Sequence, residues 1–157
     1  MRALYAIRVA AISLEALLLF ASILGWLAFE SELMGLAKAV ALNDELLKYL
    51  LVLPLGLGAW IFNEARMLLQ EDKETTRVLT AWPDYWRLKT HIWIALSYAL
   101  LFALLSIAPW TFKAGISTAG GLLAFLTSIL GQFVVAASVY VARLRVKELI
   151  AHAGAPP

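Results

Sequence analysis

The sequence predicts an all-α polytopic membrane protein, a bundle of four transmembrane helices that forms one domain over residues 1–157. Hydrophobic residues make up 62% of the chain, charged residues only 15%, and the mean hydropathy is +0.81. Soluble domains average about 25% charged residues. The apolar residues also gather into four runs. Each run is long enough to cross a bilayer as a helix, which takes about 20 residues. No remaining stretch is long enough for a soluble domain.

The first predicted span covers residues 9–29, an apolar run interrupted by Ser13, Glu15 and Ser22. A cleaved signal peptide is the alternative, but its apolar region is typically about 7–15 residues and ends at a small-residue cleavage site. The longer run, its glutamate and the lack of a clear A-x-A site favour a retained span. Residues 30–48 are more polar and keep apolar positions at helical spacing, which predicts a short amphipathic helix along the outer membrane surface, centred on residues 32–42.

The other three spans are predicted over residues 49–69, 91–110 and 116–142. Pro54 lies in the first of these, where it is expected to bend the helix or open its backbone. That helix is expected to continue past the membrane to about residue 81 and to stop before Pro83, because proline disfavours a helical conformation in the residue ahead of it. Four aromatic residues fit the belt that marks the level of the lipid headgroups. They are Trp82, Tyr85, Trp86 and Trp93.

The positions of the cations predict the orientation of the bundle, because short loops rich in Lys and Arg stay in the cytoplasm. Most of the thirteen basic residues lie near the N-terminus, the central loop or the C-terminus. Only Lys38, Lys48 and Lys113 fall on the other two connections. We therefore expect a multi-pass protein with both termini in the cytoplasm, and the composition suits a bacterial inner membrane.

Polar residues inside the spans are the candidate functional residues, because a charge in a bilayer costs about 2.5–3.5 kcal/mol even on mild scales and needs a partner. In the predicted orientation Glu15 and Glu64 lie at nearly the same depth. Gly56, Ala59, Asn63 and Arg66 share one helix face, small residues first and then polar ones. The expected intramembrane cluster comprises Arg8, Glu15, Asn63, Glu64, Arg66, His91 and Gln132. Of these, Glu15, Asn63, Arg66, His91 and Gln132 are expected to point inward.

Two interpretations of this cluster stay open. In the structural one, Glu15 or Glu64 pairs with Arg66 or Arg8, Gln132 bonds a facing helix, and the cluster sets the register of the bundle. In the functional one, a carboxylate binds a cation or moves a proton in a hydrated pocket open to the cytoplasm.

No catalytic or cofactor motif is present in the sequence. The chain contains no cysteine and two separated histidines, so thiol catalysis and a protein-built zinc or haem site are not expected. Nucleotide loops, nucleophile elbows and paired metal-ligand motifs are also missing, and we expect no enzyme, no metal, no cofactor and no nucleic-acid partner. Besides the lipid bilayer, the expected partner is another membrane protein or a second copy. The leading hypothesis is an accessory subunit or an immunity- or inhibitor-type protein, and the alternative is a small oligomeric transporter or channel subunit.

Overall fold

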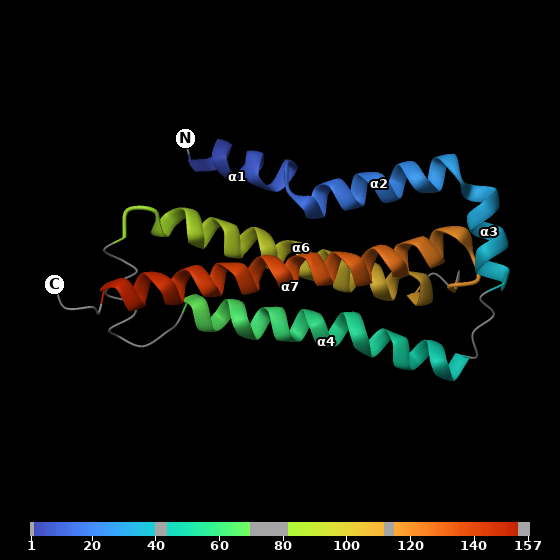
Figure 1. The fold of residues 1–157 in the computed structure, drawn as a ribbon. Coiled ribbons are helices and arrows are strands. Elements are labelled where there is room, and N and C mark those ends of the chain that lie inside the picture. The colour runs from blue at the N-terminus through green and yellow to red at the C-terminus, as the bar shows by residue number, and fades with distance from the viewer. Residues whose placement is uncertain (1, 40–43, 70–81, 112–114, 154–157) are drawn as a thin grey trace.

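The structure, a computed structural model, describes residues 2–39, 44–69, 82–111 and 115–153, and its regular elements there are all helices. The helices are α1 (Arg2–Ala11), α2 (Leu14–Ala28), α3 (Glu30–Ala39), α4 (Asp44–Leu69), α6 (Tyr85–Thr111) and α7 (Ala119–Ala153). The prediction of an all-α chain is confirmed. Figure 1 shows α4, α6 and α7 running lengthwise beside one another, with α2 alongside α7, α1 continuing from α2 toward the N-terminus, and α3 at one end.

Two of the described helices, α6 and α7, are long and apolar enough to cross a membrane. The pair of α1 and α2 is also apolar and long enough when taken together, although its two parts are bent by 50°. Within the described residues the fold therefore contains two, or up to three, segments that could span a bilayer. The start of α1, the end of α4, the start of α6 and the end of α7 lie at one end of the molecule, and α3 lies at the other (Figure 1).

The first predicted span, residues 9–29, is not one continuous helix. It is divided between α1 and α2 at Ile12 and Ser13, and Ser13 is the reason. Its hydroxyl accepts a hydrogen bond from the amide of Ala16 at 3.1 Å and donates one to the carbonyl of Ala10 at 3.0 Å. A serine side chain that caps a helix in this way competes with the backbone hydrogen bonds that would carry the helix through.

The other segments predicted as spans are helical over most of their length, but the helices differ from the prediction in where they start and end. A helix, α3, is present in the predicted amphipathic segment, and its position on a membrane surface stays a prediction. Helix α4 starts five residues before the predicted span 49–69, and α6 starts six residues before the predicted span 91–110. Helix α7 starts three residues later than the predicted span 116–142 and continues to Ala153. The predicted continuation of α4 to about residue 81 lies outside the described residues.

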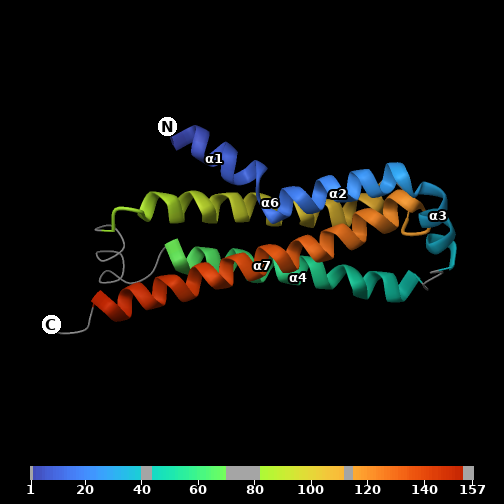
Figure 2. The same cartoon turned by 45° about the horizontal axis from the view of Figure 1, so that its top comes forward.

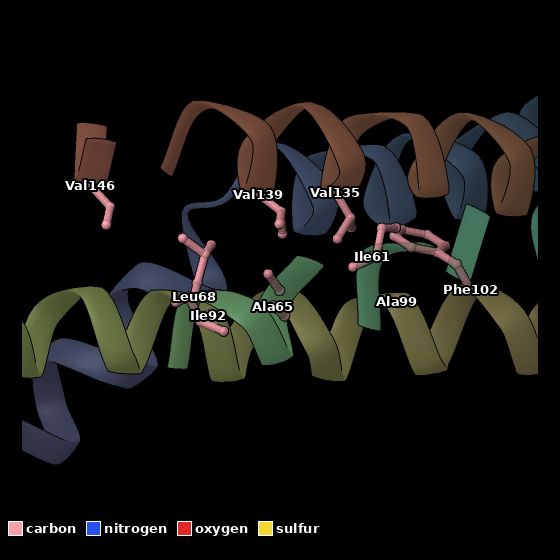
Figure 3. Close-up of a cluster of buried hydrophobic side chains, with 10 residues drawn as sticks. Ile61, Ala65, Leu68, Ile92, Ala99, Phe102, Val135, Val139 and Val146 are labelled. Carbon is pink, nitrogen blue, oxygen red and sulfur yellow. The ribbon is translucent and has the colours of Figure 1, made fainter. Parts of the chain in front are cut away.

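The core lies where α4, α6 and α7 meet (Figure 3). Ile61 from α4, Phe102 from α6 and Val135 from α7 are fully buried there. Helix α6 runs antiparallel to α7, and their backbones approach closely at Gly131, where an added Cβ would lie 2.4 Å from the ring of Phe102. Helix α2 packs on α7 from another side, so α7 lies between α2 and α4 (Figures 1 and 2).

Candidate functional site

A salt bridge joins α4 to α7 near the end of the bundle where α4 ends. The guanidinium of Arg143 donates to the carboxylate of Glu64 at 2.6 Å, and the two side chains are 34% and 8% exposed. Charge-assisted hydrogen bonds of this length are among the stronger polar contacts in proteins. Sequence reasoning placed Glu64 in the polar cluster but missed Arg143 as its partner. Depth along the predicted spans could not have suggested it, because Glu64 lies five residues inside the end of the span 49–69 whereas Arg143 lies one residue beyond the end of the span 116–142.

Glu15 is the second buried carboxylate, and its surroundings differ. It lies in the first turn of α2, directly after the break, and is only 7% exposed. Among the described residues it has neither a hydrogen-bond nor an ion-pair partner. A carboxylate in the first turn of a helix is stabilised by the positive end of the helix dipole. At the break before α2, the carbonyl of Ala10 accepts a hydrogen bond from the hydroxyl of Tyr98 on α6 at 2.8 Å, in addition to the one from Ser13.

The structure does not bring the whole predicted cluster together. Glu15, Glu64 and Gln132 are buried, whereas the other four are exposed on the surface of this chain, namely Arg8, Asn63, Arg66 and His91. The expected pairing of Glu15 or Glu64 with Arg66 or Arg8 is not found among the described residues, where Glu64 has Arg143 as its partner and α7 separates Glu15 on α2 from Arg66 on α4. The expectation that Asn63, Arg66 and His91 point into the bundle is wrong, because apolar residues such as Ile61 and Ile92 fill the inner faces of their helices.

Gln132 marks a junction of three helices. It is fully buried on α7, and its amide nitrogen donates to the carbonyl of Ala99 on α6 at 2.8 Å. On α4, Gly58 leaves the room that this amide needs, since an added Cβ there would lie 3.3 Å from the Gln132 nitrogen. The amide oxygen is buried without a hydrogen-bond partner among the described residues. A second cross-helix contact, between the hydroxyls of Ser22 and Thr127 at 2.7 Å, ties α2 to α7.

The opposite face of α4 has no neighbour in the described part of the chain. Gly56, Ala59 and Asn63, which we call the α4 face, are all exposed and follow one another at helical spacing. Nothing lies within 4 Å of a Cβ built on Gly56. The inner face of α4 at Ile61 and Ala65 is, by contrast, completely buried. The α4 face thus combines small residues with an uncovered amide, on a helix whose other side is packed.

The described residues hold no group of three or more His, Cys, Asp or Glu side chains that could bind a metal ion. Comparison of the chain with protein-family models, with curated protein sequences and with solved structures found no match.

Proposed function

We propose that the chain is a non-enzymatic four-span protein of a bacterial inner membrane, with both termini in the cytoplasm, that acts by binding another membrane protein along the α4 face. The arrangement of α4 supports a fourth span, because it runs beside the two apolar helices α6 and α7. Its 26 residues would extend about 39 Å at 1.5 Å per residue. The start of α1, the start of α6 and the end of α7 meet at one end of the molecule (Figure 1), and these parts of the sequence are rich in Lys and Arg, which supports a cytoplasmic location for that end.

The exposed amide of Asn63 beside the open surface at Gly56 is the observation that carries the proposal. Hydrocarbon offers an amide no hydrogen bonds, so Asn63 is stabilised by a polar group on another helix. Gly56 and Ala59 allow the backbone of that helix to come close. The partner we infer is therefore a transmembrane helix with small residues opposite Gly56 and a hydrogen-bonding side chain at the depth of Asn63.

Two kinds of protein carry such a helix. A second copy of this chain does so, because a two-fold axis along the membrane normal brings two Asn63 side chains together and an amide both donates and accepts. A different membrane protein would make this chain an accessory subunit or an immunity- or inhibitor-type protein. The binding surface is the same in both cases.

Leucine substitutions on the α4 face test the proposal. Gly56→Leu and Asn63→Leu are expected to weaken association at least about tenfold, measured by sedimentation and by co-purification in mild detergent. Ala137→Leu is the matched control, because Ala137 is a small exposed residue on another helix, α7. The thermal stability of the isolated chain should not fall in Gly56→Leu, because the added side chain meets open space. Equal association of the wild type and both variants would contradict the proposal.

A small transporter or channel subunit is the second candidate, and the broken first helix favours it. Irregular backbone at membrane depth commonly marks ion and substrate sites, and here it adjoins a buried carboxylate, Glu15. A cation bound there would raise the melting temperature of the wild type but not that of Glu15→Gln. The absence of any such difference with sodium, potassium and protons would remove this candidate.

A further inference from the structure

An open groove of about 230 Å³ lies between α1 and α6, close to the break in the first helix. Its lining consists of Ala10, Ile94, Ser97, Tyr98 and Leu101. The two hydroxyl groups in this set already donate to backbone carbonyls, Ser97 to Trp93 at 2.9 Å and Tyr98 to Ala10 at 2.8 Å. The groove therefore presents mainly carbon to its contents, which suits a flexible apolar chain.

A cationic and aromatic cluster lies where α1 meets the start of α6. The rings of Tyr5 and Trp86 are in edge contact at 5.0 Å between centroids. The guanidinium of Arg87 lies 5.9 Å from the Tyr5 ring and 5.5 Å from the Trp86 ring. Asp84 contacts one nitrogen of this guanidinium at 3.2 Å, but the Arg87 side chain is 54% exposed and guanidinium carries five N–H donors. An anionic group from outside the protein can thus still reach it.

The cluster and the groove follow one face of α6. Arg87, Ile94, Tyr98 and Leu101 are separated by intervals of seven, four and three residues, which keeps them on the same side of the helix. At 1.5 Å per residue, Arg87 and Leu101 are about 21 Å apart along the axis. A bilayer with its headgroups is about 40–45 Å thick, so this distance matches one leaflet. In both views α1 lies beside the first half of α6 (Figures 1 and 2).

We propose that the groove between α1 and α6 binds one anionic phospholipid. Its phosphate contacts Arg87 beside Tyr5 and Trp86, and one acyl chain lies in the groove against Ser97 and Leu101. Tryptophan, tyrosine and arginine are the residues that favour the headgroup level. An anionic lipid is preferred over a zwitterionic one because only the former carries a net charge opposite to that of the guanidinium. This site does not depend on the proposed binding along the α4 face.

Native mass spectrometry of the purified full chain tests the proposal, with phosphatidylglycerol and phosphatidylcholine of equal chain length as probes. The wild type should retain one phosphatidylglycerol in preference to phosphatidylcholine. Arg87→Gln should lower the affinity for phosphatidylglycerol about tenfold and abolish the preference, because it removes a charge-assisted contact. Ser97→Leu should weaken binding of both lipids, because the added side chain fills the groove.

Two control variants separate this site from general lipid adsorption. Lys89→Gln removes an exposed cation that comes two residues after Arg87 and lies on the opposite side of α6 from the proposed face, and Ala137→Leu enlarges an exposed residue on α7. Both should bind phosphatidylglycerol as the wild type does. Equal retention of the two lipids by the wild type would overturn the proposal. So would a Lys89→Gln variant that loses as much affinity as Arg87→Gln, or a Ser97→Leu variant that binds both lipids normally.

Discussion

Removing Arg143 is expected to destabilise the bundle more than removing Glu64, although both changes break the same salt bridge. Arg143→Gln leaves a carboxylate that is only 8% exposed without its cation. Breaking a buried pair from one side typically costs about 3–5 kcal/mol. Glu64→Gln instead leaves a guanidinium that is 34% exposed, on a long stem that can turn toward water. Its cost should therefore be about 1–2 kcal/mol, close to that of one lost hydrogen bond to a charged group.

The double variant completes a thermodynamic cycle. With both charges replaced by glutamine, the amides can still bond each other, so the cost should stay near that of Glu64→Gln alone. The coupling free energy between the two sites then equals the cost of Arg143→Gln, about 3–5 kcal/mol. Equilibrium unfolding in mixed micelles with a rising fraction of denaturing detergent, followed by circular dichroism, measures these free energies. Arg145→Gln is the control, since Arg145 is exposed on the same helix and should cost less than about 0.5 kcal/mol.

Two results would contradict a buried, interacting salt bridge between Glu64 and Arg143. One is an Arg143→Gln variant no less stable than Arg145→Gln, which would mean that the carboxylate is hydrated rather than buried. The other is exact additivity of the two single changes, which would mean that the charges do not interact in the folded bundle.

Three further predictions concern single positions. Gly131→Ala should cost more than about 1 kcal/mol of unfolding free energy, because the added methyl group overlaps a buried phenylalanine ring, whereas Gly25→Ala has open space and should be neutral or slightly stabilising. Tyr98→Phe should lower the unfolding free energy by about 1 kcal/mol, because it removes the hydrogen bond between α6 and α1. Amide hydrogen exchange at the helix break should become faster in this variant. The Ser31 hydroxyl lowers the pKa of Glu32, so Ser31→Ala should raise that pKa in an NMR titration, and the small stabilisation it removes is present at neutral pH and lost as pH falls through the lowered pKa.

The helical fold was largely predictable, because hydrophobic runs of this length have few other stable conformations. Helix ends were harder to place. Helix α7 continues past the predicted end of its span through Arg143, Arg145 and Lys147. Arginine and lysine have high helix propensity, so a helix can continue through them after it has left the apolar run. The break at Ser13 was missed because a serine within a largely apolar run signals a helix cap only when its backbone contacts are known.

The arrangement of the polar residues was less predictable than the helices that carry them. Depth along each helix could be read from the sequence, and it placed Glu15 and Glu64 at similar levels. Which helices lie next to one another could not be read from the sequence, because the depth of a residue does not reveal that α7 lies between α2 and α4. The exposure of Asn63 likewise depends on which face of α4 packs against α6, and both faces of that helix carry small residues.

Photo-crosslinking in native membranes from position 59 shows whether a partner helix covers the α4 face. A photoreactive residue in place of Ala59 should form one discrete protein adduct, and the adduct should disappear when Gly56→Leu is added. The same residue in place of Leu100, which is 63% exposed on α6, should form none. A doubled mass would identify the partner as a second copy, and any other mass would identify a different membrane protein. Labelling of lipid alone from both positions would contradict the claim that the α4 face binds a partner helix.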